Sequence, residues 1–228
     1  MIDPDGRAAG VRISHWLRRA RPVASTSVTA GVYVGLFAAT NALLRRQPAG
    51  TQQAWFSWAS TDLVNLAHHP VGSMVLSALV DDSNVLDWIA LGLIGLVAAG
   101  QSVGNLRCAL LVAVAHVVGT LISEGILMLA IATGRAPSEE RISLDIGPSY
   151  VIVAALTVGI LYGRWPARIA SAIAFALLAP YLFSGLQHLE VGPVGHCCAI
   201  LIGVALGFPW RRAWRRHDVS AVGGTVEG

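Results

Sequence analysis

Residues 108–133 read CALLVAVAHVVGTLISEGILMLAIAT, and this stretch decides what kind of fold the chain can adopt. Its only charged residue is Glu124. A helix rises about 1.5 Å per residue and the hydrocarbon core of a bilayer is about 30 Å thick, so a run of this length is long enough to cross a membrane. The stretch therefore predicts a transmembrane helix.

Five further apolar runs of about 18 residues or more lie on either side of this one. They are Val23–Leu44, Val85–Gly104, Ile146–Gly163, Pro166–Phe183 and Val191–Trp210. The composition agrees, since 54% of the residues are hydrophobic, 13% are charged and the mean hydropathy is +0.61. A soluble domain of this length needs more polar residues to cover its surface. The sequence predicts an all-α, polytopic membrane protein with a bundle of six transmembrane helices.

The polar stretches divide the chain into three parts. Residues 1–22 are basic, and the apolar run after them is too long for a signal-peptide core, so we expect an uncleaved first helix. Residues 23–212 form the membrane domain, in which residues 45–84 are too polar to span and form a long outer loop at the membrane surface. Residues 213–228 are basic and then glycine-rich, which predicts a flexible cytoplasmic tail.

All sixteen basic residues are arginines, and their distribution predicts the orientation. With the N-terminus inside, the outer segments carry only Arg45, Arg46, Arg135 and Arg141. The inner segments carry the other twelve, which are Arg7, Arg12, Arg18, Arg19, Arg21, Arg107, Arg164, Arg168, Arg211, Arg212, Arg215 and Arg216. Because cytoplasmic loops are enriched in basic residues, we expect a multi-pass protein of the cell membrane with both termini in the cytoplasm. Clusters beside apolar runs are typical of topology signals, so no nucleic-acid partner is expected.

Two polar side chains are predicted to reach the same depth in the membrane. The fourth helix enters from outside near Ile146, which places Ser149 about one turn in, and the sixth enters near Val191, which places His196 about one and a half turns in. Both would lie roughly 5–10 Å below the outer boundary, where water can reach them. A serine and a histidine at one level on two helices form a candidate nucleophile and general base.

Small residues recur every four positions on the same two helices. They are Gly195, Ala199, Gly203 and Gly207 on the sixth helix, and Ala155, Gly159 and Gly163 on the fourth. Small residues at this spacing let helix backbones approach closely in lipid. Such an approach would bring the Ser149 hydroxyl within hydrogen-bond reach of His196. The alternative is that both are ordinary packing stripes, which are common in membrane helices.

The fourth and sixth helices carry motifs that resemble those of the rhomboid intramembrane proteases. That family has Gly-x-Ser-Gly early in its fourth helix, where this chain reads Gly147-Pro148-Ser149-Tyr150. It has small-His-x-x-Gly-x-x-x-Gly early in its sixth, where this chain reads Gly195-His196-Cys197-Cys198-Ala199 with Gly203 beyond. The long outer loop also has a counterpart. The resemblance implies a rhomboid-like six-helix bundle that cleaves transmembrane protein substrates with Ser149 as nucleophile and His196 as general base. It implies no metal and no cofactor.

The chain departs from the rhomboid pattern at the expected oxyanion hole. Family members usually carry a His and an Asn one turn apart in the second helix, whereas this chain has Asn84 and Asp87 there, and Asp87 would repel an oxyanion. Tyr150 replaces the second Gly of the motif, and Val153 replaces an aromatic residue one turn after the serine. The chain therefore most resembles a divergent, actinobacterial-type branch. An alternative function is an inactive rhomboid-like protein that binds membrane clients.

The third helix adds a polar face of its own. His116, Thr120 and Glu124 follow one another at four-residue steps, with Glu124 in the outer half near the Ser149 level. Glu124 would hold water or orient a donor near the site, or the pair of His116 and Glu124 would relay protons. The competing interpretation is an interhelical hydrogen bond made by a protonated Glu124. A small transporter that uses this pair is a third possible function, although the chain lacks paired inverted halves.

The remaining polar residues have structural interpretations. Asp145 precedes the fourth helix, where it is expected to cap free N–H groups. His68 and His69 lack a third ligand at a convincing spacing, so no metal site is expected. His188 and Glu190 are expected to shape the rim of the site. Cys108, Cys197 and Cys198 are expected to be small packing residues. The sequence leaves the oligomeric state open.

Overall fold

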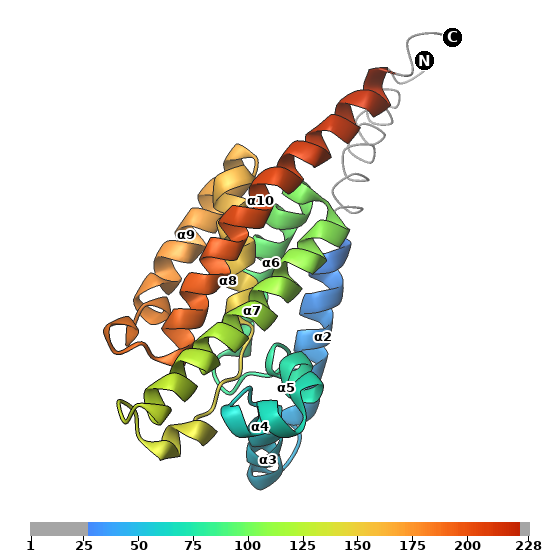
Figure 1. Ribbon diagram of the computed structural model, residues 1–228. Helices are drawn as coiled ribbons and strands as arrows, with labels where there is room; N and C mark the ends of the chain where they lie inside the picture. Colours follow the sequence, from blue (N-terminus) through green and yellow to red (C-terminus); the bar gives the residue numbers. More distant parts are fainter. Residues whose placement is uncertain (1–26, 224–228) are drawn as a thin grey trace, which may run out of the picture.

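The computed structural model describes residues 27–223, with side chains described as far as Arg212, and it is helical throughout with no strand in that range (Figure 1). The major helices are α2 (Val28–Leu44), α6 (Val85–Val103), α7 (Asn105–Ala132), α8 (Ser149–Tyr162), α9 (Trp165–Leu182) and α10 (Val191–Gly223). The shorter ones are α3 (Ala49–Ala59), α4 (Leu63–His68), α5 (Pro70–Ser77), η1 (Ser138–Ile142) and η2 (Leu186–His188).

Four of these helices are long and apolar enough to cross a membrane, namely α6, α7, α9 and the first 22 residues of α10. Their bounds agree with the predicted runs to within a few residues. The other two predicted spans form shorter apolar helices, with 17 residues in α2 and 14 in α8. The all-helical membrane fold is therefore confirmed, whereas the exact count of six spans stays a prediction.

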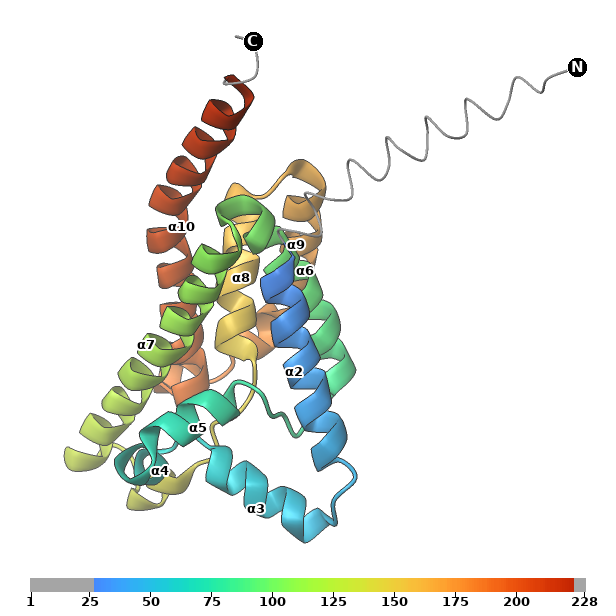
Figure 2. The same cartoon turned by 90° about the vertical axis from the view of Figure 1, so that its right-hand side faces the viewer.

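Helix α8 lies at the centre of the bundle, where it contacts α6, α7, α9 and α10 (Figure 2). Every residue from Ser149 to Gly159 is buried, as expected for a helix that is apolar on all sides. At about 1.5 Å per residue α8 is only about 21 Å long. Because other helices surround it, α8 does not need to match the bilayer by itself. It begins at Ser149, so the serine is the first helical residue and does not lie one turn inside the helix as expected.

The small residues of α10 do face α8, as predicted. A Cβ at Gly203 would lie 3.1 Å from the Ala154 carbonyl oxygen and from Thr157 Cβ, and one at Gly195 would overlap the Tyr150 ring. The stripe on α8 faces elsewhere, and that part of the expectation is wrong. A Cβ at Gly159 would meet Ala98 of α6 at 3.0 Å, because Gly159 lies about 140–180° around the helix from Ala154 and Tyr150. The close approach of α8 and α10 therefore uses glycines from α10 alone.

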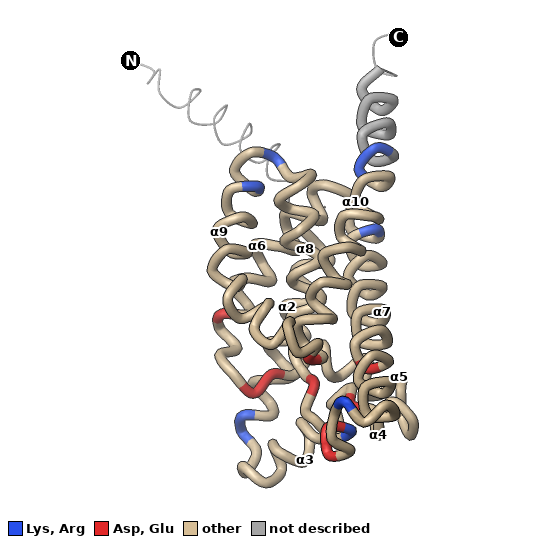
Figure 3. Tube along the Cα trace, turned by 60° about the vertical axis from the view of Figure 1, so that its left-hand side comes forward, with Lys and Arg blue, Asp and Glu red and all other residues tan. Residues whose placement is uncertain are grey.

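The two ends of the bundle differ in charge (Figure 3). We call the end that carries α3, α4 and α5 the loop end, and the opposite end the arginine end. Every acidic residue whose side chain is described lies at or near the loop end, namely Asp62, Asp81, Asp82, Asp87, Glu124, Glu139, Glu140, Asp145 and Glu190. At the arginine end the charged residues with described side chains are all basic, namely Arg107, Arg164, Arg168, Arg211 and Arg212.

Three segments of the chain were predicted to lie outside the bundle. The loop at residues 45–84 folds into three short helices, α3 to α5, that pack against one another at the loop end. The backbone of α10 stays helical to Gly223, whereas a flexible tail was expected from residue 213. The predicted basic segment at residues 1–22 and the last five residues of the tail lie outside the described part of the chain.

Candidate active site

Ser149 occupies the first position of α8 because the residues before it cannot be helical. Gly147 has a φ of +125°, a backbone conformation that L side chains rarely adopt, and it also precedes a proline, which disfavours helical geometry. The first bond of α8 runs from the Ile152 N–H to the Pro148 carbonyl. The N–H groups of Ser149, Tyr150 and Val151 therefore have no partner within the helix, as at any helix N-terminus. The Ser149 residue itself is 9% exposed.

His196 is the sixth residue of α10 and is 3% exposed. Its Nδ1 is 2.8 Å from the Leu182 carbonyl oxygen at the end of α9. Because a carbonyl oxygen only accepts hydrogen bonds, Nδ1 must carry the proton, and Nε2 keeps its lone pair. Nε2 is buried and has no hydrogen-bond partner among the described residues. The imidazole is thus held in the tautomer that a general base requires.

Tyr150 fills the space between three helices beside Ser149. Its ring centroid is 5.3 Å from that of His196 and 6.1 Å from that of His116, and its hydroxyl donates to the Val191 carbonyl at 3.2 Å. The ring fits because glycines of α7 and α10 flank it. A Cβ at Gly119 would lie 3.4 Å from the ring, and Gly195 has no room for one. The tyrosine that replaces the second motif glycine is therefore accommodated by glycines on its neighbours.

Ser149 and His196 are both buried at the loop end. Tyr150 follows Ser149 in the chain, and its ring contacts the imidazole of His196. No hydrogen bond joins the serine hydroxyl to the imidazole in the described structure, since Nδ1 binds Leu182 and Nε2 is unpartnered. The hydrogen bond predicted between these two side chains is therefore not formed in the described structure.

The polar face of α7 also points into the protein. His116, Thr120 and Glu124 are all buried, with exposures of 6%, 0% and 2%. His116 donates from Nε2 to the Met74 carbonyl of α5 at 2.9 Å, which ties the surface helix to the bundle. Four buried polar atoms at this end have no partner in the described part of the chain, namely His116 Nδ1, Thr120 Oγ1, Glu124 Oε2 and His196 Nε2. The interhelical hydrogen bond expected of Glu124 is therefore not made by Oε2.

Asp145 does not cap α8, which corrects the sequence-based expectation. The residue before α8 is Pro148, and the helix has no side-chain cap. The Asp145 carboxylate instead accepts a hydrogen bond from the Thr61 hydroxyl at 2.9 Å. Burial raises the pKa of the Asp145 carboxyl from 3.8 to about 6, the Thr61 hydroxyl opposes this rise, and the neighbouring Asp62 adds to it. Residues 84 positions apart are joined here, so no local sequence signal predicted the contact.

The residues at the expected oxyanion position face solvent. Asn84 is the N-cap of α6, where its carbonyl accepts from the Leu86 N–H at 3.3 Å and its amide donates to Asp87 at 2.8 Å. Both side chains are exposed. The pair therefore stabilises a helix end and does not line the neighbourhood of Ser149.

His68 and His69 make contacts within the loop at residues 45–84. His68 Nδ1 is 2.8 Å from the Val64 carbonyl, and His69 stacks on Trp58 while its Nε2 is 3.0 Å from the Trp58 carbonyl. His188 is exposed in η2. Among the residues that the structure describes, no group of three histidine, cysteine or acidic side chains is placed to hold a metal ion.

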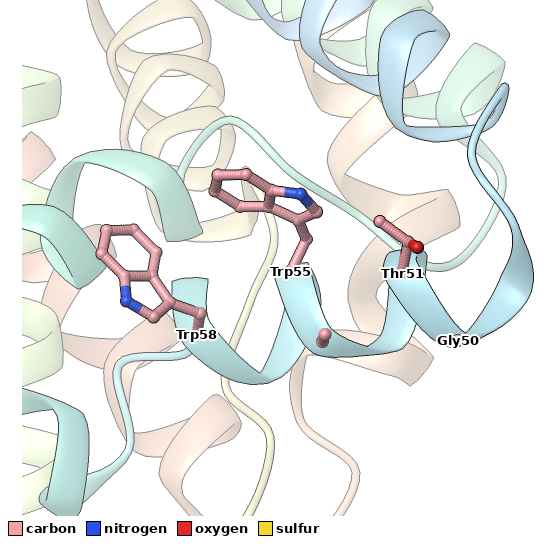
Figure 4. Close-up of a pocket in the computed structure, with 5 residues that line it drawn as sticks. Gly50, Thr51, Trp55 and Trp58 are labelled. Carbon is pink, nitrogen blue, oxygen red and sulfur yellow. The ribbon is translucent and has the colours of Figure 1, made fainter.

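A separate hollow of about 450 Å³ lies on the surface of α3 (Figure 4). It is lined by Gly50, Thr51, Ala54, Trp55 and Trp58. Trp55 and Trp58 are 46% and 43% exposed. Exposed tryptophans on a short helix are typical of the boundary between water and lipid, in agreement with the predicted surface location of this loop. The hollow contains none of the candidate catalytic residues.

Comparison with known proteins identifies the family. No curated protein and no solved structure matches the chain. A family model described as rhomboid-like protein matches residues 24–217, which include Ser149, His196 and all the major helices except the last residues of α10. The match covers well over half of the chain, and the helical membrane fold agrees with it, so the chain belongs to the rhomboid-like protein family.

Proposed function

We propose that this protein is an intramembrane serine protease that cleaves transmembrane protein substrates with Ser149 as nucleophile and His196 as general base. The observation that carries the proposal is the state of His196. The Leu182 carbonyl fixes its tautomer, and its unprotonated Nε2 is buried without a partner beside the first turn of α8. A buried acceptor without a partner is costly, and such groups cluster where a protein performs chemistry.

The reaction divides into two proton-transfer cycles. As the Ser149 oxygen attacks the peptide carbonyl carbon, its proton moves to His196 Nε2, and this nitrogen then protonates the leaving amine. Water attacks the resulting acyl-enzyme, gives its proton to Nε2 and releases the new carboxyl end, and the proton returns to the serine oxygen. Because the serine and histidine are not hydrogen-bonded in this structure, the proposal requires that the pair closes when substrate enters.

The first turn of α8 supplies the oxyanion donors in this proposal. The N–H groups of Ser149 and Tyr150 have no partner within the helix, and the positive end of the helix dipole lies there. These groups take over part of what the His and Asn of other rhomboids would contribute. Loss of one oxyanion donor costs about 100- to 1000-fold in other enzymes, so we expect slow turnover.

The charge difference between the two ends supports an orientation. We assign the arginine end to the cytoplasm and the loop end to the outside of the cell membrane, because basic residues are retained on the cytoplasmic side. Ser149 and His196 would then lie toward the outer face, and substrates would be cut near the outer end of their membrane spans. Cysteine accessibility at Thr51 and Arg164 tests this orientation, since a membrane-impermeant maleimide should label only Thr51→Cys in intact cells.

Active-site labelling tests the proposed chemistry. Purified protein in detergent should react with a fluorophosphonate probe, and Ser149→Ala should abolish the labelling while the melting temperature stays near that of wild type. Cleavage of a model transmembrane substrate should disappear in the same variant. Equal labelling of wild type and Ser149→Ala would refute the assignment of the nucleophile.

A binding protein without proteolytic activity is the second candidate. It is favoured by the missing hydrogen bond between Ser149 and His196 and by the solvent-exposed Asn84 and Asp87. In that case a transmembrane client would be captured by photocrosslinking equally well in wild type and Ser149→Ala, with no cleavage product in either. A product that depends on Ser149 decides for the protease.

A further inference from the structure

The chain that leads into α8 is held by hydrogen bonds from the outer loop. The Thr61 N–H donates to the Asp145 carbonyl at 2.9 Å, and the Asp145 N–H donates to Ser60 Oγ at 3.0 Å. The Thr61 hydroxyl lies 2.9 Å from the Asp145 carboxylate and 3.1 Å from its backbone carbonyl. Ser60 and Thr61 are both 0% exposed. This part of the loop is therefore built into the protein interior at a point four residues before Ser149.

A second contact holds the same chain two residues later. The Gly147 N–H donates to the Ser77 carbonyl, at the end of α5, at 2.8 Å. The Ser77 hydroxyl is 3.2 Å from Nε2 of His116, and that nitrogen also donates to the Met74 carbonyl, so α5 is itself anchored to α7. Figure 2 shows the chain rising from η1 past α4 and α5 into α8. Residues 145 and 147 are thus fixed at two points by the helices of one loop.

These contacts matter because α8 has no cap of its own. Pro148 precedes the helix without a side-chain hydrogen bond to it, and residues 143–148 form no regular element. The backbone of Ser149 therefore takes its position from the described contacts of residues 145 and 147 with the loop. In enzymes a displacement of about 1 Å in a reacting group can cost about 100-fold in rate. The loop contacts are consequently placed where they control the reactive hydroxyl.

We propose that Thr61, with Ser60, is a positioning residue that clamps the chain at Asp145 and thereby sets the reactivity of Ser149. The inference rests on the proposed protease function, because reactivity at Ser149 is what the clamp controls. It gives the outer loop a role in the chemistry. A movement of α3 or α4 would be transmitted to the serine through three hydrogen bonds, namely those of the Thr61 N–H, the Thr61 hydroxyl and the Asp145 N–H.

Two substitutions of nearly equal size test the clamp in the full-length protein. Thr61→Val keeps the shape and the backbone N–H but removes the hydroxyl, whereas Thr61→Ser keeps the hydroxyl. We expect Thr61→Val to slow fluorophosphonate labelling of Ser149 about 10- to 100-fold and to lower kcat for a model transmembrane substrate by a similar factor, with KM unchanged. Thr61→Ser should restore both rates to within about 3-fold of wild type.

A readout without catalysis separates failure of the clamp from failure of the protease proposal. Amide hydrogen exchange of residues 145–151 should be about 10-fold faster in Thr61→Val than in Thr61→Ser. Equal exchange and equal labelling in the two variants would overturn the clamp while leaving the protease intact. If exchange is faster in Thr61→Val but even the wild-type protein never reacts with the probe at Ser149, the protease proposal is overturned instead. If Thr61→Val does not fold, Ser60→Ala, which removes the acceptor of the Asp145 N–H, provides the same comparison.

Discussion

The arginine end and the loop end differ in how their polar groups find hydrogen-bond partners. At the arginine end, Arg211 donates to the Ser102 carbonyl in the last turn of α6, and Arg168 donates to the Ile160 carbonyl in the last turn of α8. Such bonds satisfy the carbonyls that a helix end leaves free. At the loop end, His116, Thr120, Glu124 and His196 each keep one buried polar atom without a partner.

This difference indicates that the two ends of the bundle have different roles. Unpartnered buried groups reduce stability, so a protein keeps them only where they do something else. In the half of the bundle nearer the arginine end the described contacts are mainly packing, as where Gly203 and Gly207 let α10 approach α8. Among the described residues of that half, Ser171 alone keeps a buried polar side-chain atom without a partner. The chemistry that we propose at Ser149 and His196 would account for the unpartnered groups of the loop end. The four predictions that follow challenge this division, beginning with the largest expected effect.

Substitution of His196 should affect activity far more than stability. We expect His196→Gln to lower kcat/KM for a transmembrane substrate by about 100- to 10,000-fold, the usual contribution of a general base. The amide of glutamine can still donate to Leu182, so the melting temperature should change little. Cys197→Ala, at the next position of α10, serves as the control. Unchanged activity in His196→Gln would mean that the loop end is not organised for catalysis.

Substitution in the half of the bundle nearer the arginine end should affect stability far more than activity. Gly203→Leu would place side-chain atoms against Ala154 and Thr157, and such overpacking costs about 1–3 kcal/mol. Gly31→Leu on α2 is the matched control, since nothing lies within 4 Å of its new Cβ. Thermal unfolding in detergent should show a loss for Gly203→Leu only, and labelling per folded molecule should be unchanged. A large activity loss without a change in melting temperature would contradict the division.

Replacing Glu124 by an apolar residue should make the protein more stable and less active. Its Oε2 atom is buried without a partner, so Glu124→Leu should stabilise the protein by about 1–2 kcal/mol. The same substitution should slow substrate cleavage if the carboxyl holds water or orients a donor. Thermal unfolding and initial cleavage rates measure the two effects, with Glu124→Gln as the isosteric comparison. A lower melting temperature in Glu124→Leu would show that the carboxyl is structural.

The pH dependence of stability should be modest and should come from the loop end. The pKa of Asp145 is raised in the folded protein to about 6, so folding favours its protonated form. Stability is then greatest below about pH 4 and falls as the pH rises to about 6, by about 1–2 kcal/mol for this partly exposed group. Melting temperatures between pH 4 and 7.5 should fall less in Asp145→Asn. A residual slope is expected from Asp81, whose pKa is also raised by burial.

Much of the site was predictable because its signals are local. Apolar runs define helices, and counting the runs and arginines assigns Ser149 and His196 to the same end. The orientation of the α8 stripe was predicted wrongly, since spacing shows which residues share a face but not which neighbour that face meets. The role of Asp145 was also missed, because its partner Thr61 lies 84 residues away and follows no spacing rule.

The sequence by itself determined that this is a helical membrane protein, because hydrophobic length acts residue by residue, and its short motifs around Ser149 and His196 carry the resemblance to the rhomboid family. Only the tertiary structure decided which polar atoms find partners. The tautomer of His196 depends on a carbonyl of α9, and the place of Tyr150 depends on glycines of α7 and α10. The chain just before α8 is hydrogen-bonded to Thr61 and Ser77 of the loop at residues 45–84. Hydrogen bonds act over about 3 Å, so they exist only once helices distant in sequence have packed.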